Sequence, residues 1–369
     1  MKIPPVKLNF DENEREEVKS NVDSILSSGF LTLGKFCKQF EANFSSYVGT
    51  KHGVATNSGT SALEIILRSF GLNNSEVIVP TNTFFATPAA VLHSGNKVKF
   101  ADCDKSLCVG VDSIKKSITG STKAVIVVHI GGIVTPEIMQ IKELCEQQGL
   151  LLIEDAAHAH GSTLNGKHAG SFGDAAAFSF FATKVMTSAE GGMVVTNNKE
   201  VYDNSLILRD QGKSGLGNIH TLLGYNWRMG EINAAIGLSQ LERLNGLIEG
   251  REKIAEIYFD GLKDIDGINP LVVDKGNKSN YYKYTCFIDD VDRGKLKVTM
   301  KEKYGISLAG EVYEKPCHLQ PVFKDIGYKL GDFPVAEKLC QGHICLPIYP
   351  SMGIEEAQYV VDSLRAELK

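Results

Sequence analysis

Hydrophobic and polar positions in the first half of the chain form blocks that predict strands and helices in turn. Short apolar runs rich in β-branched residues are typical of buried strands, and longer segments with apolar residues every three or four positions are typical of helices. The predicted strands are 53–56, 77–80, 98–102, 124–129 and 150–155. The predicted helices are 13–27, 34–47, 62–70, 87–92, 111–118 and 136–148. This alternation indicates an α/β fold with a mostly parallel central sheet covered by helices on both faces.

The pattern changes near residue 246, where the composition becomes more charged. A helix is predicted over 231–244, and the segment beyond it has a strand-like run at 284–288. Further helices are predicted at 293–304, 333–340 and 354–368. We therefore predict a large domain over residues 1–246, which includes an N-terminal helical segment, and a smaller C-terminal α+β domain over residues 247–369.

Polar residues follow the carboxyl ends of the predicted strands, which is where open α/β sheets bind their ligands. Residues 57–61 (Asn-Ser-Gly-Thr-Ser) stand between a strand and a helix, an arrangement that points backbone N–H groups and hydroxyls at an anion. Taken alone, the same residues are slightly better explained as a plain helix cap. Residues 81–85, His129 and Asp155 also follow strands. Together these positions predict a ligand site at one edge of the sheet.

A lysine closes a strongly apolar run at residues 178–184 (Phe-Ser-Phe-Phe-Ala-Thr-Lys), and a double glycine follows at 191–192. At the end of a buried element Lys184 loses hydration, which favours the neutral, nucleophilic amine. Paired with Asp155 at a strand end, it indicates a Schiff-base site in which an acid holds the ring nitrogen of a cofactor. Taken alone, Lys184 is better explained as a solvated lysine after a core strand.

Composition narrows the function classes further. The 369 residues are 43% hydrophobic and 22% charged, and a net charge of -5 without a basic block argues against nucleic acid or an anionic membrane as the main partner. The N-terminus has no apolar signal core and no stretch is long enough to span a bilayer, so we expect a cytoplasmic protein with reduced cysteines. We predict no metal, because Asp155, His158, His160 and His168 match the usual ligand spacings poorly.

The motifs together resemble the DegT/DnrJ/EryC1/StrS family of pyridoxal-phosphate-dependent sugar aminotransferases. The resemblance spans nearly the whole chain, and its specificity comes from the order of the motifs. They are 57–63 (NSGTSAL), 80–84 (PTNTF), 153–161 (IEDAAHAHG), 170–174 (GSFGD), 178–184 (FSFFATK), 190–193 (EGGM), 224–226 (GYN), 318–321 (HLQP) and 346–350 (LPIYP).

This resemblance implies a homodimer of fold type I with active sites shared between subunits and pyridoxal 5'-phosphate as cofactor. Lys184 would bind the cofactor as a Schiff base and move the proton, and Asp155 would pair with the protonated ring nitrogen. His158 would lie near the phenolic oxygen of the ring, and Phe84 would stack on its face. The remaining implied cofactor contacts are Thr60, Ser61 and Ser179 at the phosphate, and Asn226 from the other subunit.

The implied reaction moves an amino group from an amino acid, L-glutamate, to a nucleotide-linked ketosugar, in the biosynthesis of amino sugars for surface glycans or related products. Three positions depart from the family pattern: Ala182 and Pro88 replace other residue types, and Gly131 removes an aromatic side chain near the substrate. The residues expected to border the substrate are Gly131, Tyr313 and His318.

Alternative functions stay open at this point. The change at Gly131 leaves room for an acceptor without a nucleotide, either a free ketosugar or a keto-phosphate. Sugar dehydratases of the same family carry histidine at the position of Lys184, so the lysine argues against that reaction. A non-catalytic regulatory or binding paralogue with the same fold is disfavoured by the intact set of Lys184, Asp155 and Ser179.

Overall fold

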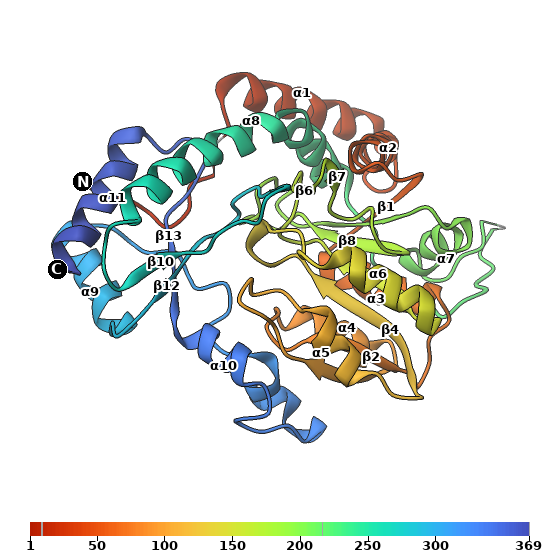
Figure 1. Cartoon of the computed structure of the whole chain (residues 1–369). Helices are drawn as coiled ribbons and strands as arrows, with labels where there is room; N and C mark the ends of the chain where they lie inside the picture. The colour runs from red at the N-terminus through yellow and green to blue at the C-terminus, as the bar shows by residue number, and fades with distance from the viewer. Residues whose placement is uncertain (9, 216, 369) are drawn as a thin grey trace.

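The computed structural model describes residues 1–8, 10–215 and 217–368 (Figure 1). A seven-stranded sheet forms the centre of the larger part. Its strands in spatial order are β1 (His52–Thr56), β9 (Gly192–Thr196), β8 (Ala175–Ser179), β5 (Leu151–Asp155), β4 (Thr122–Val128), β2 (Glu76–Pro80) and β3 (Lys97–Ala101). The strands from β8 to β3 run parallel, whereas β9 is antiparallel to both its neighbours. The prediction of a mostly parallel sheet is confirmed.

Helices cover both faces of this sheet, and the alternation of side chains along a strand explains why. Val125 and Val127 of β4 belong to one apolar cluster and Ala124 and Ile126 to the other, and both clusters are buried. The first cluster includes side chains of the first two helices and of α6, and the second includes side chains of α3, α4 and α7. These helices are α1 (Glu12–Ser28), α2 (Lys35–Val48), α3 (Gly59–Ser69), α4 (Ala86–His93), α5 (Val111–Ser117), α6 (Ile138–Gln148) and α7 (Lys199–Arg209).

The C-terminal part is built on a smaller antiparallel sheet of β10 (Ile268–Pro270), β12 (Tyr284–Ile288) and β13 (His343–Leu346). Its helices are α9 (Arg293–Tyr304), α10 (Pro334–Gln341) and α11 (Ile354–Glu367), with short 3-10 turns at Ile130–Gly132, Cys317–Leu319 and Pro321–Ile326 elsewhere in the chain. A third small sheet, β6 (Thr163–Leu164), β7 (Lys167–His168) and β11 (Asn277–Lys278), joins residues from both halves of the sequence. None of the helices in the described part has the length and apolarity that crossing a bilayer requires.

The helix predicted to end at residue 244 is much longer. Helix α8 runs without interruption from Glu231 to Leu262, and it packs against α1, α2 and α11 (Figure 1). Its buried stripe continues past the predicted end through Leu247, Ile248 and Tyr258 at helical spacing. Exposed charges near 246, such as those of Glu249 and Lys253, therefore mark the outer face of this helix and not its end. Residue 246 falls inside α8, and the division of the chain into two domains at that point stays a prediction.

Candidate active site

A cavity of about 430 Å³ lies at the carboxyl ends of the central strands. Its wall comes from the N-terminal turn of α3, the ends of β4, β5 and β8, residues 181–191, and residues 282–283 and 311–313 of the C-terminal part. Seven residues that the sequence predicted for the site line it: Thr60, Phe84, Asp155, His158, Ser179, Lys184 and Tyr313. The cavity thus collects predicted residues, from Thr60 to Tyr313, that are up to 253 positions apart in the sequence.

Asp155 ends strand β5 and is 5% exposed. Its Oδ2 accepts a hydrogen bond from Thr87 Oγ1 at 2.7 Å, and its Oδ1 accepts one from the Ala157 backbone N–H at 3.2 Å. Burial raises the pKa of Asp155, while these two hydrogen bonds and the nearby Lys184 oppose the rise. A cation placed against this carboxylate would restore its ionised form, which suits a partner for a protonated ring nitrogen.

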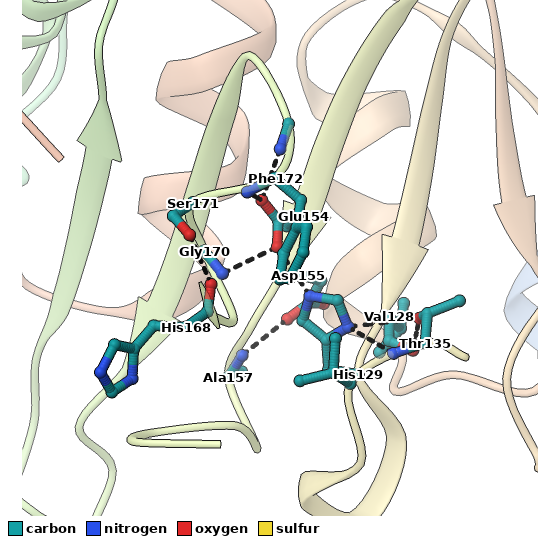
Figure 2. Close-up of polar contacts among 12 residues, drawn as sticks. Val128, His129, Thr135, Glu154, Asp155, Ala157, His168, Gly170, Ser171 and Phe172 are labelled. Atoms are coloured by element: carbon teal, nitrogen blue, oxygen red, sulfur yellow. Dashed lines mark hydrogen bonds and ion pairs between the residues drawn. The ribbon is translucent and has the colours of Figure 1, made fainter. Parts of the chain in front are cut away.

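The preceding residue, Glu154, faces away from the cavity because consecutive strand residues point to opposite sides of a sheet. It is fully buried, and Figure 2 shows its carboxylate held by the loop that follows β7. The carboxylate oxygens of Glu154 accept hydrogen bonds from the backbone N–H groups of Gly170, Phe172 and Gly173, each at 2.7 Å. His129 Nε2 adds a fourth at 2.8 Å. Burial alone would raise the pKa of Glu154, but these donors lower it overall. Glu154 therefore holds the loop and His129 in place, whereas Asp155 faces the cavity.

Lys184 does not sit directly at the end of a strand, as the apolar run predicted. Strand β8 ends at Ser179, and Lys184 follows in a turn in which its N–H donates to the Phe181 carbonyl at 2.9 Å. Its Nζ lies 4.9 Å from the centroid of the Tyr282 ring. Burial lowers the pKa of Lys184 to about 8, with Asp155 opposing this shift and Lys283 adding to it. The ammonium still predominates near physiological pH, but far more of the amine is neutral than in an ordinary lysine, and this fraction is able to act as nucleophile or base.

The Lys184 amine should accordingly become reactive as pH rises through about 8 in the cofactor-free protein. Only the deprotonated amine attacks an acylating reagent, so the rate is low below the pKa and reaches a plateau above it. Acetylation of the peptide that contains Lys184, followed by mass spectrometry over a pH series, checks the midpoint. In an Asp155→Asn variant the carboxylate that favours the ammonium is gone, and the midpoint should move to lower pH. A midpoint at the ordinary value for lysine, about 10.4, would contradict the prediction.

His158 packs against two aromatic rings of the C-terminal part. Its ring centroid lies 4.4 Å from that of Tyr282 and 6.1 Å from that of Tyr313. Burial and the nearby Lys184 hold the pKa of His158 well below its ordinary value, so the imidazole is neutral. The Gly131 N–H donates to His158 Nδ1 at 3.4 Å, which assigns the remaining proton to Nε2.

The N-terminal turn of α3 forms a cradle at the bottom of the cavity. Ser58 caps the helix by accepting the Ser61 N–H at 3.1 Å. A Cβ added at Gly59 would lie 2.8 Å from the Cβ of Ser179, so the turn approaches β8 more closely than a larger residue allows. The N–H groups of a helix N-terminus, with the hydroxyls of Thr60 and Ser179 beside them, fit a phosphate group.

Four predicted residues lie outside the described lining of this cavity: Ser61, Gly131, Asn226 and His318. The Ser61 hydroxyl donates to Asn57 Oδ1 at 2.7 Å and is thus satisfied within the turn. His318 is 2% exposed, and its ring nitrogens contact Thr81 Oγ1 at 2.7 Å and Glu337 at 3.0 Å, which places it behind the wall. Asn226 is exposed and pairs through its backbone with Asp210, so its role in a second subunit stays a prediction.

Sequence reasoning missed several residues of the wall, above all Tyr282, Lys283 and Glu311. Tyr282 and Lys283 stand just before the predicted strand 284–288, which was a usable sign, since ligands gather at strand ends. The apolar pattern of residues 284–288 does not indicate that this strand lies beside the carboxyl ends of the larger sheet. That information comes from the tertiary arrangement alone.

The central sheet, the lysine with its lowered pKa and the buried aspartate fit a pyridoxal-phosphate-dependent enzyme of fold type I. The sequence model of the DegT/DnrJ/EryC1/StrS aminotransferase family matches residues 12–365, and the chain belongs to this family. It is thus a sugar aminotransferase that uses pyridoxal 5'-phosphate. Solved relatives include a putative sugar aminotransferase of Streptococcus pneumoniae in its PMP form. That structure has a TM-score of 0.89 at 28% identity and covers 99% of this chain and 97% of that one.

Similar proteins cover the chain almost completely. The GDP-perosamine synthase of Vibrio cholerae is 35% identical, with 98% of both chains aligned. The dTDP-3-amino-3,4,6-trideoxy-alpha-D-glucose transaminase of Micromonospora megalomicea is 33% identical over 96% of this chain and 95% of its own length. The crystal structure of DesV from S. venezuelae has a TM-score of 0.94 at 30% identity and covers 100% of this chain and 99% of that one. The predicted family, fold type and cofactor are confirmed.

Proposed function

We propose that this enzyme moves an amino group from L-glutamate to the keto carbon of a nucleotide-linked sugar. The observation that carries the proposal is the composition of the cavity wall, where Lys184 and Asp155 of the larger part face Tyr282, Lys283 and Tyr313 of the C-terminal part. Aromatic and cationic groups opposite the lysine suit a sugar with an anionic substituent. Relatives named for GDP-, dTDP- and UDP-linked amino sugars support the same class of acceptor.

Five residues of the wall, namely Thr60, Asp155, His158, Ser179 and Lys184, have a definite part in this reaction. Pyridoxal phosphate, when bound, supplies an electron sink for the pair left behind when a proton leaves carbon. The α3 turn with Thr60 and Ser179 would hold its phosphate, and Asp155 would keep the ring nitrogen protonated. Lys184, with its pKa lowered to about 8, removes a proton from one carbon and returns it to another. The neutral His158 offers an N–H donor beside it.

We also propose that two copies associate and that Asn226 of each completes the site of the other. Large apolar side chains are exposed at the cavity and on the segment that carries Asn226, among them Phe84 at 59% and Leu223 at 83%. Such side chains on one chain support coverage by a second copy. We place the enzyme in the cytoplasm, since all eight cysteines within the described residues are buried, unpaired thiols.

The proposed function is tested with purified protein and isotopically labelled glutamate. The protein should show the visible absorbance of its cofactor, and glutamate should bleach this absorbance. A nucleotide-linked ketosugar should restore the absorbance and accept the labelled nitrogen. A protein that takes up no pyridoxal phosphate would contradict the proposal. Recovery with free ketosugars or keto-phosphates and not with nucleotide-linked ones would establish the alternative acceptor class in its place.

A further inference from the structure

A second cavity of about 230 Å³ adjoins the active-site cavity and shares Thr183, Tyr282 and Lys283 with it. Its other walls come from Pro5 and Val6 near the N-terminus, from α8, and from residues 309–310 and 346–348. Two of its lining side chains, those of Arg251 and Lys283, are cationic, and no aspartate or glutamate is among the described residues that line it. The cavity thus carries positive charge without a matching carboxylate.

Of the two cations, Arg251 gives the stronger evidence for an anion site in this cavity. It is 3% exposed on α8, and its Nη1 donates to the carbonyls of Tyr281 at 3.1 Å and Ile348 at 3.0 Å. Its Nε has no hydrogen-bond partner within the part of the chain that the structure describes. Burial lowers the pKa of Arg251 to about 10. A buried guanidinium is costly unless an anion compensates it.

Lys283 stands at the boundary between the two cavities. Its N–H donates to the Gly131 carbonyl at 3.1 Å, and its Nζ donates to the Gly310 carbonyl at 2.9 Å, which leaves two further donors on the ammonium. The neighbouring Glu311 favours this ammonium only in part, because its carboxylate is bonded to Lys297 at 2.8 Å and lies 3.6 Å from Arg293. Burial lowers the pKa of Lys283, so an anion at its Nζ would stabilise the ammonium.

We propose that this second cavity binds a phosphoryl group of the acceptor through Arg251 and Lys283. The proposal rests on the proposed function and specifies its substrate, a sugar that carries a diphosphate. The Nζ atoms of Lys184 and Lys283 lie 4.9 and 5.6 Å from the centroid of the same Tyr282 ring, so the reacting amine and the second cation border one aromatic side chain. The diphosphate then enters the second cavity, where the planar guanidinium offers a fork of donors to its oxygens.

The test measures binding of inorganic pyrophosphate, UDP, GDP and dTDP to the holoenzyme by calorimetry. We expect salt-sensitive binding to the unmodified protein and a loss of affinity of about tenfold or more in Lys283→Gln. Lys283→Arg keeps the charge and should retain most of the affinity. Lys295→Gln makes the same change at an exposed lysine on α9 and should leave binding unaltered. The cofactor absorbance and circular dichroism of each variant report whether it is folded.

Glutamate serves to separate the two anions of the reaction. The Lys283→Gln change should weaken the binding of pyrophosphate by a larger factor than it weakens the binding of glutamate. The affinity for glutamate is measured from the bleaching of the cofactor. The reverse order would assign the lysine to a carboxylate of the donor and overturn the proposal. An unmodified holoenzyme that binds neither pyrophosphate nor any of the three nucleotides would overturn it as well. If the enzyme binds pyrophosphate but aminates no ketosugar, the proposed function fails while the phosphoryl site stands.

Discussion

Replacing Lys184 by alanine is expected to reduce turnover by about 10⁴-fold or more while the fold stays intact. The Lys184 side chain lines the cavity, and its amine has a pKa of about 8, which suits proton transfer at physiological pH. Removing a desolvated ammonium costs little stability, so the variant should fold normally. The measurements are kcat with glutamate and a nucleotide-linked ketosugar, and the circular dichroism spectrum.

Two further variants sharpen this prediction. Lys184→Arg keeps a positive charge, but its guanidinium stays protonated and cannot accept a proton, so it should be as inactive as the alanine variant. Lys295→Ala removes an exposed lysine on α9 and should keep the full rate. A Lys184→Ala enzyme with normal kcat would show that another group moves the proton.

Replacing Glu154 by alanine is expected to lower the free energy of unfolding by about 3–5 kcal/mol. The change leaves the N–H groups of Gly170, Phe172 and Gly173 and the ring of His129 without their acceptor in a fully buried place (Figure 2). The Thr135 N–H donates to His129 Nδ1 at 3.0 Å, so the ring carries its proton on Nε2 and cannot avoid the loss by changing tautomer.

Urea unfolding monitored by circular dichroism measures this loss. Glu302→Ala on the exposed surface of α9 is the matched control and should change the free energy of unfolding by less than about 0.5 kcal/mol. Equal unfolding midpoints for the two variants would mean that water replaces the carboxylate in the loop and that Glu154 is not needed to hold it.

The strand ends made the core of the site predictable. In a parallel sheet the carboxyl ends of neighbouring strands share one edge, so residues as distant as Thr60, Phe84 and Asp155 meet there whatever loops separate them. The apolar runs fix where the strands lie, because a central strand is buried on both faces. The positions of the strands, and the edge at which their carboxyl ends meet, can therefore be predicted without tertiary information.

The direction of individual side chains was not predictable in the same way. Thr60 and Ser61 are adjacent on a helix, and successive residues point about 100° apart, so only Thr60 lines the described cavity. His318 looked like a substrate contact, but partners more than ten positions away in sequence, Thr81 and Glu337, satisfy its ring. No sequence signal distinguished Arg251 from the exposed charges around it, because only the packing of α8 shows it to be buried.

The unbroken helix α8 has a consequence for motion. Its 32 residues make a strut of about 48 Å that reaches from α1 and α2 to α11. A hinge needs residues that absorb large changes in backbone dihedral angles, and a continuously hydrogen-bonded helix supplies none along this crossing. Both ends of the helix therefore move together, and any change in the shape of the two cavities falls to the shorter segments that line them, such as residues 5–6 and 311–313.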